Sequence, residues 1–346
     1  MFSSRILIRT AQFALLTGSL LLSSVLAAQT PAFVSFDAPG AGTAKGQGTF
    51  QGWINSSGVV ATSYVDSNNF LHGMVRAANG QITEFDAPKS IETSVEGINS
   101  KGQVIGWYVN DTDTATYGFL RSPSGVMYSF SVPGASFNEP RAINDSGVVI
   151  GDYNLDLNHP HEGFLRDASG NYTLFDVAGA GTAPSQGTFP VAIDAGNAVT
   201  GYYIDSSNVA HGFFRDASGN ITSFDMGTAT YPYAINTGGQ VVGVYNETGH
   251  NEHAFLRDAE GNLSNIDASG ASQTNTYSIN DSGLICGNII GGLGKATPAW
   301  RDASGVYHSI ALPQPNSGGS ANSINNNGRM TGSWTDADGV YHGFVR

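Results

Sequence analysis

Two short segments each combine two histidines with a glutamate, a set of side chains that can bind a metal ion. They are His159, His161 and Glu162 in the first segment, and His250, Glu252 and His253 in the second. Imidazole and carboxylate groups are ligands that zinc and iron accept in proteins. Neither spacing matches the helical motif of a metalloprotease, and both segments lie in predicted loops. We take the second segment as the candidate metal site. Solvated loops are the alternative, and no cofactor is expected.

A second group of residues suits the binding of an organic ligand. Trp107 and Tyr202 each precede an aromatic residue that recurs in the sequence, so in a strand they point to the opposite face, where a ring can stack on a sugar. Asp205, Gln47 and Gln186 lie in loops rich in acidic or polar residues. These five residues are the candidate ligand-binding set, with strand packing and solvated turns as the alternative interpretation. The sequence contains no G-x-S-x-G, P-loop or H-E-x-x-H motif, so we assign no catalytic residue.

An arginine recurs two residues after an apolar strand residue and therefore shares its face of the strand. We predict that its stem covers the neighbouring part of the fold while its head group finds carbonyls or a carboxylate, such as Asp86 or Asp225. A ligand-binding ring of arginines is the alternative. This structural set consists of Arg76, Arg121, Arg166, Arg215, Arg257, Arg301 and Arg346. Four recurring histidines, His72, His211, His253 and His342, are likewise predicted to be structural.

These residues are positioned by one unit that occurs seven times. An Ile-Asn pair, once Ile-Asp, precedes a glycine turn and recurs every 42 to 50 residues. The pairs end at Asn55, Asn99, Asn144, Asp194, Asn236, Asn280 and Asn325. A fixed period of this length is typical of repeat architectures such as β-propellers.

Each repeat is predicted to form four short strands. In the third copy they are 141–144, 148–153, 163–166 and 172–176, separated by turns rich in Gly, Asp, Asn and Ser. The repeat therefore predicts an all-β fold, a seven-bladed β-propeller with four-stranded blades. The first predicted strand, 33–37, and the last, 343–346, would together complete one blade, so the N-terminal strand should pair with the C-terminal strand. An open solenoid is the alternative.

The run His253-Ala254-Phe255-Leu256-Arg257 and its copies, such as His211-Gly212-Phe213, resemble the repeat of the HAF family of extracellular repeat proteins. The adjoining Ala-Ile-Asn-x-x-Gly pattern fits as well, and the resemblance covers essentially all of residues 29–346. It implies bacterial export and a repeated β-fold, and it implies no catalytic residue. The sequence departs from the pattern at Tyr117, Glu162 and Pro298.

Residues 1–28 differ from the rest of the chain. Arg5 and Arg9 precede an apolar stretch that ends in Ala27-Ala28, a pattern typical of a cleavable signal peptide. We therefore predict a signal peptide at 1–28 and one domain at 29–346, secreted to the exterior or the periplasm as a monomer with no membrane span. The formal net charge of −13 disfavours nucleic acid as a partner.

The longer, variable loops should share one face of the propeller, where function usually resides. Two are near copies, beginning at Gly40 and Gly179. We predict a binding or interaction module that uses this face, with a glycan or a protein as ligand. The alternatives are a carbohydrate- or lactone-active enzyme that uses acidic loop residues, and a purely structural surface protein. Fold alone does not choose among them.

Overall fold

The computed structural model describes residues 32–112, 115–248, 252–292, 294–315 and 317–346. The predicted signal peptide lies outside these residues, as does His250. The described residues form 28 β-strands and no helix, so the all-β prediction is confirmed. Consistently, they contain no helix with the length and apolar character needed to cross a membrane.

Each repeat contributes strands in a fixed order. The first strands are β2 (Gly48–Ile54), β6 (Ser90–Ile98), β10 (Phe137–Ile143), β14 (Gly187–Ile193), β18 (Ala229–Ile235), β22 (Gln273–Ile279) and β26 (Gly318–Ile324). The second strands are β3 (Val60–Val65), β7 (Val104–Asn110), β11 (Val149–Asn154), β15 (Val199–Ile204), β19 (Val241–Asn246), β23 (Ile285–Ile290) and β27 (Met330–Thr335). The third strands are β4 (Leu71–Arg76), β8 (Thr116–Arg121), β12 (Glu162–Arg166), β16 (Ala210–Arg215), β20 (Glu252–Arg257), β24 (Ala296–Arg301) and β28 (Tyr341–Val345). The fourth strands are β5 (Ile82–Phe85), β9 (Met127–Phe130), β13 (Tyr172–Phe175), β17 (Ile221–Phe224), β21 (Leu263–Asn265) and β25 (Tyr307–Ser309), and β1 (Val34–Phe36) takes this place beside β28.

The strands of the described residues form six sheets. Five have four antiparallel strands in sequence order, and the sixth has eight, in the order β26-β27-β28-β2-β3-β4-β5 with β1 also paired to β28. The pairing of β1 with β28 is antiparallel, as expected, with Val34 opposite Val345. One parallel bridge between Gly48 and Tyr341 joins β2 to β28 and makes the eight-stranded sheet. The structure thus shows six sheets where seven separate blades were predicted.

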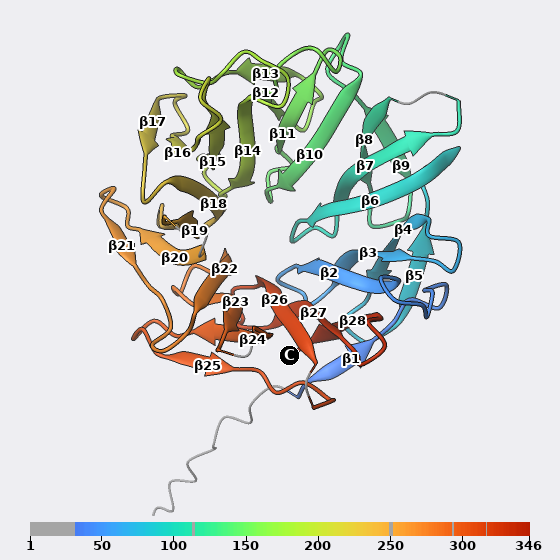
Figure 1. Cartoon of the computed structure of the whole chain (residues 1–346). Helices are drawn as coiled ribbons and strands as arrows, with labels where there is room; N and C mark the ends of the chain where they lie inside the picture. Colours follow the sequence, from blue (N-terminus) through green and yellow to red (C-terminus); the bar gives the residue numbers. More distant parts are fainter. Residues whose placement is uncertain (1–31, 113–114, 249–251, 293, 316) are drawn as a thin grey trace, which may run out of the picture. The chain divides into compact units, whose positions relative to one another are not determined.

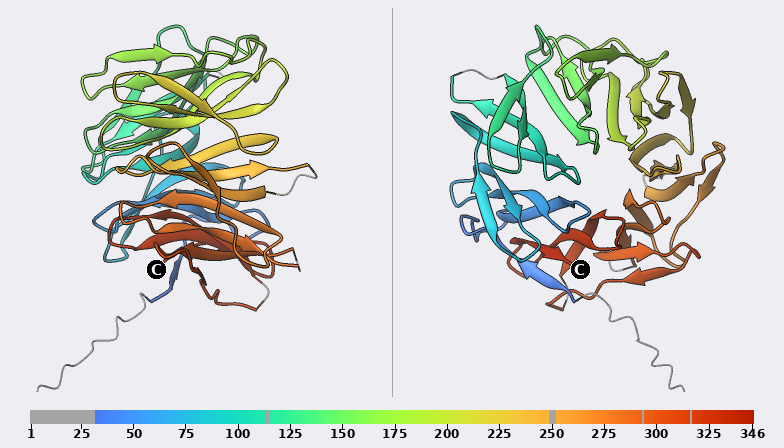
Figure 2. Two further views of the ribbon diagram at one scale, coloured as in Figure 1. Left: turned by 90° about the vertical axis from the view of Figure 1, so that its left-hand side faces the viewer. Right: turned by 180° about the vertical axis from the view of Figure 1, so that it is seen from behind.

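The sheets are arranged around a common centre, with the first strand of each repeat nearest to it (Figure 1; Figure 2 shows the side and the rear). β10, β14 and β18 are edges of their sheets, so they tolerate Pro140, Pro190 and Pro232 without losing a ladder hydrogen bond. At each of these prolines the register to the second strand shifts. The prediction began this strand of the third repeat at Arg141, whereas β10 begins at Phe137.

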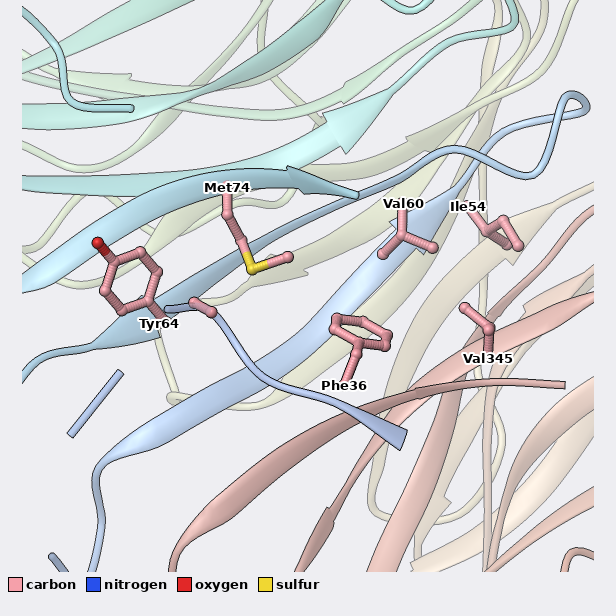
Figure 3. Packing of buried hydrophobic residues seen from close by; sticks show 7 residues of the cluster. Phe36, Ile54, Val60, Tyr64, Met74 and Val345 are labelled. Carbon is pink, nitrogen blue, oxygen red and sulfur yellow. The ribbon is translucent and has the colours of Figure 1, made fainter. Parts of the chain in front are cut away.

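The core lies between neighbouring repeats. The third strands contribute its largest fully buried side chains, which are Met74, Phe119, Phe164, Phe213, Phe255 and Phe344. Figure 3 shows the cluster at the two ends of the described chain, where Phe36 of β1 lies beside Val345 of β28 and faces Val60 and Met74. Cys286 is also buried, at the position where other repeats carry a small or apolar residue.

The recurring arginines pack across the gap between repeats. In six of them the guanidinium lies over an aromatic ring at 4.7–5.7 Å from its centroid, as with Arg121 over Phe85. Five donate to the carbonyl of the following residue. Burial lowers the pKa of Arg76 and Arg121. Of the two expected partners, carbonyls or a carboxylate, these arginines take the carbonyl. Asp86 and Asp225, which follow the fourth strands, accept hydrogen bonds from His72 Nδ1 (2.9 Å) and His211 Nδ1 (2.8 Å) instead.

The asparagines that end the first strands join one repeat to the next. The side-chain amide of Asn55 donates to the carbonyl of Asn99, and the same bond continues through the other repeats until Asn325 donates to Asn55 at 2.8 Å. The exception is Asp194, which has no amide to donate to Asn236. Burial and the charge of Asp281 raise the pKa of Asp194.

We expect Phe36→Ala to lower the free energy of unfolding by about 3 kcal/mol, because it empties the space that β1 fills between β28 and the first repeat. Urea denaturation measures this loss. Val34→Ala on the same strand, at an exposed position, is the control and should change stability by less than about 0.5 kcal/mol. A loss of similar size in both variants would contradict the contribution of Phe36.

We expect Asp194→Asn to raise the free energy of unfolding by about 1 kcal/mol, because the new amide supplies the missing donor to the carbonyl of Asn236. Asn280→Asp is the reverse change in an intact link and should lower stability. Thermal melting of both variants at neutral pH checks the pair. A destabilised Asp194→Asn protein would show that a seventh asparagine hydrogen bond between repeats does not add stability.

Candidate functional site in the central cavity

A cavity of about 160 Å³ lies at the centre of the sheets and is lined by residues of all seven first strands. Side chains alternate along a strand, so every second one points toward the cavity, except where a register shift interrupts the alternation. The chemistry-bearing residues of its wall are Trp53, Glu96, Arg141, Tyr233, Tyr277 and Asn322. We call this space the central cavity.

Behind Arg141 stand two more charged groups of the same repeat. Glu139 lies two residues earlier on β10, and Asp152 is its partner across the β10–β11 ladder. The Arg141 guanidinium contacts Glu139 Oε1 at 2.8 Å through Nη1 and donates through Nε to Asp152 Oδ1 at 3.2 Å. Asp152 is fully buried, so this guanidinium is its charge partner in a region of low dielectric.

The second oxygen of Asp152 positions His161. Asp152 Oδ2 lies 2.8 Å from His161 Nδ1, which fixes the tautomer and directs Nε2 away from the pair. The imidazole lies between the rings of Phe137 and Phe189, and Phe189 in turn stacks on Tyr202 at 4.9 Å. The result is an imidazole held by a buried carboxylate and by an aromatic wall.

The backbone of His161 is held by one of the two near-copy loops. His161 N–H donates to the carbonyl of Gln186, and Thr188 N–H donates to the carbonyl of His161, each at 2.8 Å. Gly187 between them has φ +116°, and a Cβ there would collide with the His161 carbonyl oxygen. The other near-copy loop makes the same contact, with Gly48 against Tyr341.

Glu96 comes from the preceding repeat. Its Oε1 accepts hydrogen bonds from Trp107 Nε1 at 3.1 Å and from Ser94 Oγ at 2.9 Å. Burial raises the pKa of Glu96, with Arg141 acting in the opposite direction. The carboxylate thus has neutral donors on one side and the cavity on the other.

One guanidinium serves three carboxylates in this region. Burial raises the pKa of Glu139 to about 8, because Arg141 offsets only part of the cost and Asp152 and Glu96 add repulsion. Burial alone would lower the pKa of Arg141, but Asp152, Glu139 and Glu96 together raise it. Groups with shifted pKa values that converge on a cavity are candidates for function.

Tyrosines form the opposite wall. Tyr233 and Tyr277 lie 5.9 Å apart between centroids, and Tyr231 meets Tyr202 edge to face at 5.2 Å. Burial, followed by the nearby charge of Glu252, raises the pKa of Tyr231 and Tyr233. Burial also raises the pKa of Tyr202 to about 12. These phenols therefore stay neutral and present ring faces and hydroxyls.

The structure brings two of the five predicted ligand-binding residues to this region. Trp107 holds Glu96, and Tyr202 belongs to the aromatic wall beside His161. Gln47 and Gln186 are buried, and their amides hydrogen bond within the near-copy loops. Asp205 accepts from the backbone of Ser207 and Val209 in its own turn. Ligand binding by these residues stays a prediction.

The predicted metal set is not assembled by the described residues. Glu252 and His253 are neighbours on β20 and point to opposite faces, since His253 bonds Asp267 at 2.6 Å whereas Glu252 lies near the tyrosines. His250 lies outside the described residues. Across the described residues, no three His, Cys, Asp or Glu side chains are grouped to hold a metal ion. In the other segment, Glu162 accepts from Tyr153 and His159 pairs with Asp156.

The sequence analysis missed Glu96, Glu139, Arg141 and Asp152 as a site. A signal was present, because they are departures from the repeat. The last repeat has uncharged residues where the third has Glu139, Arg141, Asp152 and His161. In the same order, these uncharged residues are Ser320, Asn322, Ser333 and Tyr341. Because the last repeat folds with uncharged residues at the same positions, the fold does not require these charged side chains. Such departures from a repeat mark a candidate site.

No family model and no curated protein sequence matches the chain. Among solved structures, a streptogramin B lyase is similar at 14% identity, with a TM-score of 0.59 and 91% of this chain and 97% of that chain covered. A catalytically inactive virginiamycin B lyase from Staphylococcus aureus with quinupristin is 14% identical, with a TM-score of 0.58, and the match covers 91% of this chain and 99% of that chain. The β-propeller domain of the Trilobed protease from Pyrococcus furiosus is 8% identical, with a TM-score of 0.55, and the match covers 86% of this chain and 95% of that chain. At these identities the likeness shows the fold alone, a β-propeller.

The pKa of Glu139 predicts a pH dependence of stability. The folded protein keeps this proton up to about pH 8, whereas the unfolded chain loses it near 4.5. The folded state therefore binds more protons between these values, and the free energy of unfolding falls as pH rises, by at most about 1.4 kcal/mol per unit. Glu139→Gln should flatten this slope and raise stability near pH 8.

Urea denaturation at several pH values across this window tests the prediction. Glu260→Gln removes the same charge from an exposed turn and should leave the slope as it is. An unchanged slope in Glu139→Gln would mean that Glu139 is ionised throughout the window.

Proposed function

We propose that the chain is a seven-bladed β-propeller that binds a ligand at its central cavity. Counting the eight-stranded sheet as two blades supports the number seven, because the single Gly48–Tyr341 bridge has an exact counterpart between His161 and Gly187 that leaves its two sheets separate. All seven first strands line one cavity, and the amide of Asn325 reaches Asn55. In this count, β1 completes the last blade.

The observation that carries the binding function is the charged cluster of the third repeat, which reaches the cavity through Arg141. Glu139, Arg141, Asp152 and His161 replace uncharged residues of the last repeat, so the fold can be built without them. Buried charges cost stability unless they are retained for another reason. We infer that this reason is ligand recognition. The later residues of the first strands, such as Trp53 and Arg141, line the cavity, and the variable-loop face, where these strands begin, is the proposed entrance.

Export to the cell exterior or periplasm belongs to the proposal, as does membership of the HAF family. The apolar segment of residues 1–28 supports export, and the recurring His-Gly-Phe runs support the family. A glycan and a protein side chain are both ligands that an aromatic and carboxylate-lined cavity can accept.

A second candidate function is enzymatic turnover, favoured by the Asp152–His161 pair. A buried carboxylate that holds Nδ1 leaves Nε2 able to take a proton from a bound substrate. Glu139, whose pKa burial raises to about 8, would supply an acid beside Arg141.

The test uses the last repeat as a template. A fourfold variant with Glu139→Ser, Arg141→Asn, Asp152→Ser and His161→Tyr gives the third repeat the side chains of the last. We expect it to fold and melt like the parent protein and to lose binding of ligands found in a screen of glycans, peptides and metabolites by at least tenfold. A ligand that binds both proteins equally would place the site elsewhere, and turnover lost in the variant would favour the enzyme.

A further inference from the structure

We propose that the ligand of the central cavity is a small organic ammonium ion with N–H groups. This inference rests on the proposed function and names the class of its ligand. Three independent features of the cavity carry it, namely its aromatic faces, its balance of charge and a buried acceptor without a partner.

The aromatic faces come from three separate first strands. Trp53 of β2, Tyr233 of β18 and Tyr277 of β22 all line the cavity. Aromatic faces attract a cation through the ring quadrupole, and the attraction grows when the site excludes water. The cavity is narrow enough for a cation at its centre to meet more than one ring, because residues from all seven first strands line its volume of about 160 Å³.

The balance of charge at the cavity is set by more acidic than basic side chains. Glu96 lines it, while Glu139 and Asp152 occupy the guanidinium of Arg141, the one arginine of the wall, at 2.8 and 3.2 Å. Glu252 lies near the tyrosine side, where the amide of Asn275, in its favoured orientation, donates to it at 3.1 Å. Within the described part of this wall, Arg141 is thus the single basic group among several acidic ones, and the hydrogen-bond donors of Glu96 are neutral. A bound cation would favour the ionised forms of Glu96 and Glu139, which burial disfavours.

The unpartnered acceptor is Asn322. Its side chain lines the cavity, and its Oδ1 atom is buried with no hydrogen-bond partner among the described residues. A buried acceptor without a donor costs free energy, and a ligand N–H would recover it once the amide turns its oxygen from the wall toward the cavity. A primary ammonium donates up to three hydrogen bonds, whereas a quaternary ammonium donates none. Asn322 therefore favours a primary ammonium.

The experiment is calorimetric titration of the full-length mature protein with n-butylammonium at low ionic strength. Three matched ligands separate the features. We expect butylammonium to bind at least tenfold more tightly than 1-butanol, which has a similar shape without the charge. We expect butyltrimethylammonium, which has the charge without N–H groups, to bind more weakly than butylammonium.

Two variants locate the ion. Glu96→Gln keeps an oxygen acceptor for Trp107 and Ser94 and should weaken butylammonium binding roughly tenfold, the cost of about 1.4 kcal/mol for one lost charge contact. Glu260→Gln removes the same charge from an exposed turn and should leave binding unchanged. Glucosamine and Nα-acetyl-lysine methylamide in the same titration show whether an amino sugar or a lysine side chain is the better source of the ammonium.

Equal binding of butanol and butylammonium, or an equal effect of the two glutamate variants, would overturn the proposal. Absence of butylammonium binding would overturn it as well. In that case, an uncharged ligand that binds the parent protein and not the fourfold variant would leave the cavity as the binding site and exclude only the ammonium class. If no ligand distinguished the parent protein from that variant, the proposed function would fail too.

Discussion

The hydrogen bond from one first-strand asparagine to the carbonyl of the next is the contact on which the architecture depends. Most first strands are sheet edges, and this bond ties the end of one to the neighbouring repeat, with further bonds such as Ser100 N–H to Asp145 Oδ1 beside it. The bond sets a constant spacing between the ends of the first strands. Residues three positions before the asparagine, such as Glu96, Arg141, Tyr233 and Tyr277, are consequently brought to one cavity. The asparagine hydrogen bonds thus determine the geometry of the site, and they do so without contacting a ligand.

The fold was largely predictable because its signals are local and repeated. Glycine turns after Asn or Asp and alternating apolar residues mark strands wherever they occur. Two features were not predictable in this way. The beginning of β10 was missed because Pro140 argues against a strand, and only its place at a sheet edge makes the proline acceptable. The eight-stranded sheet depends on a single bridge between Gly48 and Tyr341, residues almost the length of the chain apart.

The candidate site was predictable only in part. Alternation along a strand identified Trp107 and Tyr202 as residues that point away from the repeated aromatics, and both reach the region of the cavity. The meeting of Glu139 with Asp152 depends on cross-strand register across a shifted ladder, which composition and spacing do not determine. The aspartates expected to pair with arginines bond histidines instead, because they follow the fourth strand on the side of the histidine. Phenylalanine rings take the place beside the arginines.

The pairing of β1 with β28 has a consequence for synthesis. A ribosome makes β1 long before Val345, so β1 has no partner in its final sheet until β28 has been made. Until then, β1 and β27 each lack the neighbour that β28 provides, and such unpaired edges are prone to associate with other chains. Contacts this distant in sequence also form slowly. The nascent protein is therefore most exposed to aggregation before β28 emerges, and chaperones that shield strand edges would act in that interval.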